Sequence, residues 1–198
     1  DGTTEIGTFS IDPATGQVTF TPTDKSYTGK VTPAKVQAES SNGIKVDTTY
    51  TPEIVPVTPT ATPAETTDIQ GATQTGKPEF KGGIVTVDGV EKTVEINEAV
   101  PSTFDDGSTT KTVEGVGTYT VAADGTVTFV PEKSFVGTAP AVTVVREDKN
   151  GMKASATYTP TVLPVTPTAT PAETSDIQGA TKNGKSGFTE GHSRVRMI

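Results

Sequence analysis

The only histidine of this 198-residue chain is His192, which stands near the C-terminus. Hydrolytic triads need a histidine that packing holds between a nucleophile and a carboxylate. The residues around His192 show no pattern that would hold it in this way. We also find no phosphate-binding loop, dinucleotide-binding glycine motif or paired-histidine zinc motif. The sequence therefore offers no catalytic or cofactor-binding residue, and we predict that the protein is not an enzyme.

Two acidic clusters are the remaining candidates for a metal site. They are residues 105–107 (DDG) and residues 147–151 (EDKNG). Calcium takes six or more oxygen ligands, often from loops of this composition. However, Asp-Gly and Asn-Gly are also favoured in tight turns, and Lys149 inside the second cluster would repel a cation. We therefore predict turns at both places, with no metal and no cofactor.

An isopeptide crosslink between a lysine and an asparagine is a further possibility for this composition. Asn42, Asn150 and Asn183 each precede a glycine in an expected turn. Lys35 alternates with apolar neighbours and should point outward. Asn97 is the acceptor that this reasoning excludes least. We expect no crosslink, and intact mass tests this because each such bond releases one ammonia.

Composition and charge favour an extended, exposed β-protein. Hydrophobic residues make up 31% of the chain and aromatic residues 6%, with no Trp, while Gly (20) and Pro (15) are plentiful. This mixture favours short strands and turns. The formal net charge of −8 makes nucleic acid and anionic membrane surfaces poor partners. No apolar run approaches the ~20 residues of a transmembrane helix, so we expect no nucleic-acid partner and no membrane insertion.

An internal repeat is the strongest signal in the sequence. Residues 56–66 (PVTPTATPAET) recur without change as residues 164–174, which lie 108 positions later. Residues 68–73 (DIQGAT) recur at the same spacing as residues 176–181. A repeat of this length has the size of an independent domain. The chain therefore reads as an array of similar domains.

Further matches set the expected boundaries. Residues 49–52 match 157–160 without change, and residues 7–11 (GTFSI) are similar to 117–121 (GTYTV). We expect residues 1–56 to be the C-terminal part of a first repeat, residues 57–164 to be one complete repeat, and residues 165–198 to be the N-terminal part of a third. We expect 182–198 to be irregular or poorly packed. The chain has no apparent signal peptide or wall-sorting tail, so we expect it to be an internal piece of a longer protein.

Alternation predicts the fold of one repeat. Tyr119, Val121, Val127 and Phe129 are separated by single residues within two runs, which is the period of half-buried strands. The Asp124-Gly125 pair between the runs predicts a type I′ hairpin turn. About seven short strands, spaced roughly 8–12 residues apart, predict an all-β fold of tandem immunoglobulin-like β-sandwich repeats.

Residues 57–66 are expected to join the repeats. Pro59 and Pro63 fix the backbone and remove hydrogen-bond donors, so the segment should be extended. We interpret it as a semi-rigid linker, in part packed as a strand. The alternative is an edge strand followed by a loop.

These residues resemble a known family. The matching segments are VTPTATPAET (57–66 and 165–174), the segments that begin with DIQGAT (68–80 and 176–188), residues 101–129 and residues 145–162. They resemble the fibril repeats of CshA-type surface adhesins of Gram-positive bacteria. Residues 82–97 and 192–198 depart from the family pattern.

The resemblance implies a non-enzymatic stalk or fibril on the cell surface. Such repeats belong to extracellular, cell-wall-anchored proteins, and they hold a distal binding region away from the cell. The implied partners are neighbouring repeats of the same chain, while binding of a host matrix protein or partner cell belongs to regions outside this sequence. The alternative is a repeat that itself binds a host glycan or matrix protein, although the lack of Trp speaks against a sugar site.

Overall fold

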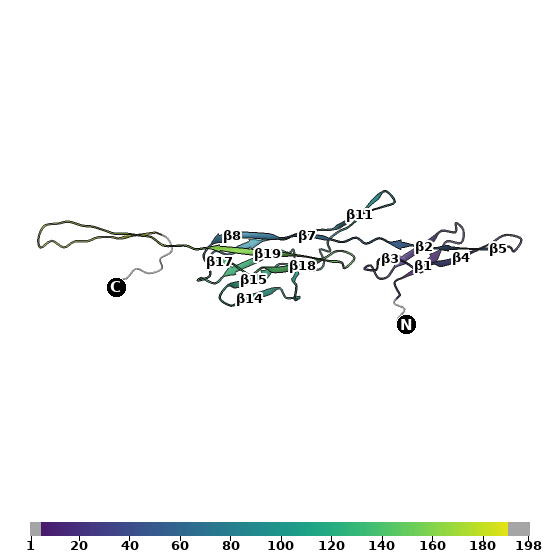
Figure 1. The fold of residues 1–198 in the computed structure, drawn as a ribbon, viewed down its shortest axis with the longest axis horizontal. Coiled ribbons are helices and arrows are strands. Elements are labelled where there is room, and N and C mark those ends of the chain that lie inside the picture. Colours follow the sequence, from purple (N-terminus) through teal and green to yellow (C-terminus); the bar gives the residue numbers. More distant parts are fainter. Residues whose placement is uncertain (1–4, 190–198) are drawn as a thin grey trace.

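The computed structural model describes residues 5–189, which contain strands and no helix. The strands fall into three units that follow one another along the long axis of the molecule (Figure 1). We call residues 5–56 the first unit, 57–164 the complete unit and 165–189 the third unit.

The complete unit contains two packed sheets, which confirms the expected all-β sandwich. One sheet has the order β13 (Thr103–Phe104), β18 (Val142–Glu147), β19 (Lys153–Leu163). β19 also pairs with β17 (Gly137–Thr138) and with β8 (Ala64–Ile69). The other sheet has the order β14 (Thr110–Val113), β15 (Gly117–Val121), β16 (Val127–Pro131), β9 (Gln74–Gly76).

One strand pair determines where the chain enters and leaves this unit. β8 and β19 run parallel, with Ala64 opposite Tyr158 and Ile69 opposite Leu163, whereas all other described pairs are antiparallel. The first and last long strands therefore point the same way. As a result the chain enters the unit at one end and leaves it at the other (Figure 1).

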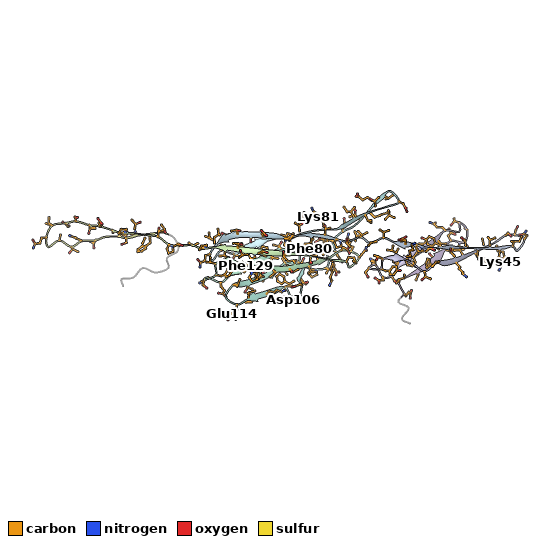
Figure 2. All side chains as sticks on the ribbon, in the orientation of Figure 1. Lys45, Phe80, Lys81, Asp106, Glu114 and Phe129 are labelled. Atoms are coloured by element: carbon orange, nitrogen blue, oxygen red, sulfur yellow. The ribbon has the colours of Figure 1, made fainter. Side chains whose placement is uncertain are left out.

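The core lies between the two sheets and follows the predicted alternation. In β15, Tyr119 and Val121 are buried, and in β16, Val127 and Phe129 are buried. The rings of Tyr119 and Phe129 lie 4.6 Å apart at their centroids. Figure 2 shows Phe129 inside this unit. The buried apolar cluster consists of Phe104, Tyr119, Val121, Val127, Phe129, Ala139, Val142, Val144, Tyr158 and Val162.

The turn between β15 and β16 differs from the predicted type I′ turn. Ala122 N donates to Thr126 O at 2.8 Å, and Gly125 N donates to Ala122 O at 3.0 Å, which encloses a three-residue loop. Gly125 has a φ of 88°, and Asp124 does not share the left-handed conformation. The type I′ prediction was wrong here because Asp124 accepts the Thr126 N–H through its carboxylate and holds an ordinary turn followed by a glycine bulge.

The type I′ geometry occurs instead at the tip of a projecting hairpin. Asp88 (φ 51°) and Gly89 (φ 76°) join β11 (Gly83–Val87) to β12 (Val90–Val94). These strands pair only with each other within residues 5–189, and the hairpin stands away from the sandwich (Figure 1). It lies within residues 82–97, the segment that we expected to depart from the family pattern.

The segment expected to be a linker is largely strand. β7 (Thr60–Thr62) pairs with β10 (Glu79–Lys81), and β8 follows directly after Pro63. Pro63 interrupts the strand because it has no N–H to donate. Only residues 57–59 remain as an extended connection without strand pairing. The edge-strand alternative therefore describes the second half of this segment.

The first unit repeats strands of the complete unit. Its strands are β1 (Gly7–Ile11), β2 (Val18–Pro22), β3 (Gly29–Lys30), β4 (Ala34–Glu39), β5 (Lys45–Tyr50) and β6 (Glu53–Ile54). Ala34 faces Tyr50 as Val142 faces Tyr158, so the register is the same. Every residue of β5 is exposed, and side chains stand out on both sides of the chain near Lys45 (Figure 2).

The third unit repeats the opposite part. β20 (Ala169–Thr170) pairs with β21 (Gly187–Phe188), and Ala169 faces Phe188 as Ala61 faces Phe80. Residues 182–189, expected to be poorly packed, are all exposed. The rest of that expected irregular segment lies outside the described residues.

Candidate functional site

A polar network joins the first strands of the complete unit to its last strand. Thr66 on β8 donates to Gln74 Oε1 on β9 at 2.6 Å, and its oxygen lies 2.7 Å from the hydroxyl of Tyr158 on β19. Gln74 Nε2 donates to Thr161 O at 2.9 Å. Gln74 and Tyr158 are buried. We call this group, Thr66, Gln74, Tyr158 and Thr161, the seam.

The seam requires a glycine beside the ring of Tyr158. A Cβ at Gly76 would lie 2.2 Å from Cε2 of Tyr158 and 3.2 Å from Cγ2 of Thr66. Carbon atoms in contact normally lie about 3.5–4.0 Å apart. Because β9 is also held by its pairing with β16, any side chain at position 76 would displace the Tyr158 ring.

Gln70 forms hydrogen bonds at the end of the complete unit where the chain leaves it. Its N–H donates to Leu163 O at 2.8 Å, and its side-chain Nε2 donates to Lys133 O at 2.9 Å. Its Oε1 accepts the N–H of Val165 at 3.4 Å. Gln70 therefore contacts the chain on both sides of the boundary between the complete and third units. It belongs to the duplicated DIQGAT segment, and its counterpart is Gln178.

We expect Gln70→Ala to lower the free energy of unfolding of the complete unit by about 1 kcal/mol, since two side-chain hydrogen bonds are lost at a partly exposed site. Chemical denaturation followed by circular dichroism measures this. The matched control is Gln178→Ala, whose exposed side chain should leave the transition unchanged. Equal effects from both variants would contradict the role given to Gln70.

Burial of Tyr119 predicts a loss of stability at high pH. Burial, with a smaller contribution from Tyr158, raises the pKa of Tyr119 to about 12. Below pH 10.0, the ordinary pKa of tyrosine, Tyr119 is protonated in both the folded and the unfolded protein. Its titration therefore does not lower the free energy of unfolding in that range. As the pH rises from there toward about 12, the unfolded tyrosine loses its proton and the folded one does not, so the free energy of unfolding falls.

Thermal unfolding measured across this alkaline range tests the prediction. Tyr119→Phe is the matched variant, because it keeps the ring and removes the titrating hydroxyl, which donates to Pro140 O at 2.7 Å. The alkaline decrease in stability should be smaller in this variant. An unchanged decrease would show that other groups cause it.

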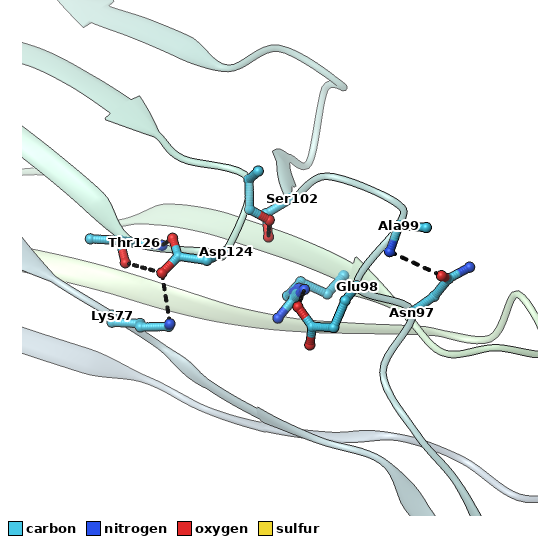
Figure 3. Close-up of polar contacts among 9 residues, drawn as sticks. Lys77, Asn97, Glu98, Ala99, Ser102, Asp124 and Thr126 are labelled. Atoms are coloured by element: carbon cyan, nitrogen blue, oxygen red, sulfur yellow. Dashed lines mark hydrogen bonds and ion pairs between the residues drawn. The ribbon is translucent and has the colours of Figure 1, made fainter.

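A charged hollow of about 490 Å³ includes Asp124, which precedes β16, whereas Gln70 contacts Lys133, which follows β16, so the two lie at opposite ends of this strand. Lys77 Nζ lies 2.8 Å from Asp124 Oδ2 (Figure 3). Arg146 Nη2 lies 2.8 Å from Glu98 Oε2. Phe80 contributes an apolar wall. The pKa of Asp124 is held well below its usual range, chiefly by the hydrogen bond from Lys77 and then by those from Thr126.

Arg146 is the unusual member of this hollow. The residue is 8% exposed, and its Nε is buried without a hydrogen-bond partner in the structure. The side chain of its partner Glu98 is largely exposed. The hollow is lined by two cations, by the carboxylates of Glu79, Glu98 and Asp124, and by an apolar wall, which together suit a polar ligand. Its lining among residues 5–189 contains no nucleophile paired with a base.

Sequence reasoning did not find this hollow. Lys77, Glu98, Asp124 and Arg146 come from separate segments that only the fold brings together. Two features of the sequence could have indicated these residues. Lys77 and Phe80 recur as Lys185 and Phe188 in the third unit. Arg146 continues the inward alternation of β18, where the first unit has Ala38.

The first acidic cluster forms a turn. Phe104 N donates to Ser108 O at 2.8 Å, and Asp106 accepts the Ser108 N–H at 2.9 Å. Hydrogen bonds from Ser108, with a smaller contribution from Lys111, lower the pKa of Asp106 to about 2. Lys111 also pairs with Asp105. The ammonium group of Lys111 thus occupies the place beside these two carboxylates that a metal ion would need.

The second acidic cluster is also a turn. Asp148 is buried, and its Oδ1 accepts the N–H groups of Asn150 and Met152 at 2.8 and 2.9 Å. In the first unit the hydroxyl of Ser40 accepts the N–H of Ile44 in the same way. Within residues 5–189 no three His, Cys, Asp or Glu side chains gather as a metal site would require.

The remaining candidates from the sequence are placed as follows. The side-chain oxygen of Asn97 accepts the N–H of Ala99 at 3.2 Å in a local turn (Figure 3). Lys35 is exposed, as expected. His192 lies outside the described residues. Among residues 5–189 there is no helix with the length and apolar character needed to cross a membrane.

Comparison with known proteins identifies the family. The family model described as the surface adhesin CshA repetitive domain matches residues 2–54 and 56–162. The chain belongs to this family. The NMR structure of repeat domain 13 of the fibrillar adhesin CshA from Streptococcus gordonii is 58% identical over 34% of this chain and 86% of that one, with a TM-score of 0.21. None of the curated proteins matches the chain.

Membership of the CshA repeat family confirms the resemblance seen in the sequence. The protein is an all-β, tandemly repeated region of a surface adhesin. The family match covers the strands of both the first and the complete unit, which agrees with their shared register.

Proposed function

We propose that this chain is a section of a non-enzymatic stalk or fibril that projects a distal binding region from the bacterial cell wall. The parallel pairing of β8 and β19 is the observation that carries the proposal. Parallel first and last strands put the entry and exit of a repeat at opposite ends. Each added repeat therefore lengthens the array, whereas antiparallel terminal strands would fold it back.

The contacts of Gln70 support the same role. They fasten the exit of one unit to the start of the next at Val165. At the other end, Gly83 packs closely on the connection, since a Cβ there would lie 2.5 Å from Thr58 O. The short connection of residues 57–59 is thus in contact with folded structure, which limits bending between units.

Electron microscopy of polypeptides with increasing numbers of complete repeats tests the stalk function. We expect rods whose length grows by the same increment for each added repeat. Compact particles, or rods that bend freely at every junction, would contradict it. Immunogold labelling of the native protein on intact bacteria would test its extracellular, wall-anchored location.

Ligand binding at the charged hollow is a second candidate function. The buried Nε of Arg146, which has no hydrogen-bond partner, beside the exposed Glu98 favours it. The ligand class is a host glycan or a polar segment of a host matrix protein such as fibronectin. Surface plasmon resonance should show binding that Lys77→Ala weakens and Lys185→Ala, its counterpart in the third unit, does not. Flat traces for the unaltered chain would exclude this function.

A further inference from the structure

The charged hollow of the complete unit is lined by two ion pairs. Lys77 Nζ lies 2.8 Å from Asp124 Oδ2, and Arg146 Nη2 lies 2.8 Å from Glu98 Oε2. Glu79 adds a further carboxylate to the lining. A ligand that enters the hollow therefore meets cations that already have partners, and it must leave no buried charge without one.

We propose that the hollow binds a neutral sugar residue through its hydroxyl groups. The inference rests on the ligand-binding function proposed above for the hollow, and it names the chemical class of the ligand. A hydroxyl both accepts and donates hydrogen bonds. One hydroxyl can therefore accept from Arg146 and donate to Glu98, or accept from Lys77 and donate to Asp124, so that both members of an ion pair keep a partner.

Charged ligands fit the same lining less well. An ammonium group bound to Glu98 would draw that carboxylate away from Arg146, which is 8% exposed. A buried cation without a partner is costly. A carboxylate ligand would instead approach Glu79, Glu98 and Asp124, and like charges repel. A neutral ligand avoids both penalties.

Arg146 has hydrogen-bond donors left for a ligand. A guanidinium carries five N–H donors. Nη2 of Arg146 donates to Glu98, whereas its Nε is buried without a partner in the structure. Because burial already holds the side chain in place, a new hydrogen bond from the guanidinium costs little further side-chain entropy.

The aromatic wall suits the C–H face of a sugar ring. Phe80 packs against the core, which holds its ring in place. A Cβ at Gly125 would lie 3.7 Å from Phe80 Cε2 and 3.7 Å from Arg146 Cδ, so the ring and the arginine approach the same point. A sugar ring carries hydroxyls at its edge and C–H groups on its faces. Its face can therefore lie on Phe80 while its edge reaches Arg146.

Comparison of the two repeats indicates that the fold does not require these charges. In the first unit Ala38 stands at the position of Arg146, and Thr15 stands at the position of Asp124. Nevertheless β4 and β5 keep the register of β18 and β19, and β1 and β2 keep that of β15 and β16. The comparison favours recognition over folding as the role of the charges.

NMR titration of the full, isotope-labelled chain tests the proposal, because it follows the backbone N–H groups and the Nε–H of arginine. The neutral probes are methyl glucoside, methyl galactoside and methyl mannoside. Glucuronic acid and glucosamine are their anionic and cationic counterparts. We expect at least one neutral probe to shift the signals of Phe80, Gly125 and Arg146 with a millimolar Kd. The charged counterparts should bind about fivefold more weakly.

Variants assign the binding to the hollow. Arg146→Ala, which copies Ala38 of the first unit, should weaken binding about tenfold. Lys77→Ala changes an exposed side chain and should weaken binding about threefold, so it keeps the test valid if the Arg146 variant does not fold. The matched control is Lys153→Ala, since this lysine is exposed and does not line the hollow. It should leave the Kd unchanged.

Salt dependence adds a second readout. Salt screens contacts between exposed charges, so binding of a neutral sugar should change little as the salt concentration rises. Tighter binding of glucuronic acid or glucosamine than of every neutral probe would overturn the proposal and leave ligand binding at the hollow in place. Absence of shifts with every neutral probe, or equal binding by the Arg146→Ala and Lys77→Ala variants, would also overturn it. The stalk function depends on none of these results.

Discussion

Tyr158→Ala is expected to lower the free energy of unfolding of the complete unit by about 3–5 kcal/mol, the range for removing a buried aromatic ring. Tyr158 is fully buried in the core, and its hydroxyl meets Thr66. The variant removes the ring from beside Gly76 and leaves a cavity between β8, β9 and β19. Denaturation followed by circular dichroism measures the change.

The first unit supplies a matched control for this prediction. Tyr50 has the same place in the repeat and the same register, but it is 38% exposed. Tyr50→Ala should change the free energy of unfolding by less than about 1 kcal/mol, because an exposed side chain loses little burial. Similar losses in the two variants would contradict the view that β8 and β9 bury the tyrosine.

Pulling the complete unit by its two ends should require several times more force than pulling its β18–β19 hairpin apart. Force applied between residues 57 and 164 draws β8 and β19 in opposite directions along their length. Their parallel ladder, which pairs residues 64–69 with 158–163, must then break as a whole. Force across the hairpin opens one pair at a time. Mechanical lifetime follows the unfolding barrier in that direction.

Single-molecule force measurements with engineered cysteines test this difference, and the chain has no native cysteine to interfere. Cysteines at residues 57 and 164 load the parallel pair. Cysteines at Thr143 and Thr157, which face each other across β18 and β19, load the hairpin. Equal rupture forces in the two geometries would remove the mechanical reason for the parallel pairing in a stalk.

Much of the fold could be predicted from local sequence. Alternation along Tyr119, Val121, Val127 and Phe129 correctly identified the buried face of two strands. A side chain in a strand points to one face or the other, so a period of two is readable without knowing any partner. The repeat spacing correctly identified the strands of the first unit that share this register.

Turn geometry was predicted less well. Asp124-Gly125 and Asp88-Gly89 have the same dipeptide, yet only the second adopts the type I′ turn. The difference lies in the Thr126 contacts to Asp124 and in the pairing of Lys77 with that carboxylate. A dipeptide preference is weak enough for such contacts to decide between turns.

Sequence alone determined that this protein is a tandem array of β-domains, since repetition and alternation are local properties of the chain, and the wording of its segments resembled the CshA repeat family. Only the tertiary structure decided how the domains are closed and joined. Thr66 and Tyr158 meet although 92 residues separate them, and the parallel direction of β8 and β19 follows from such contacts. Strand pairing depends on which distant edge buries the most apolar surface, and no short segment contains that information.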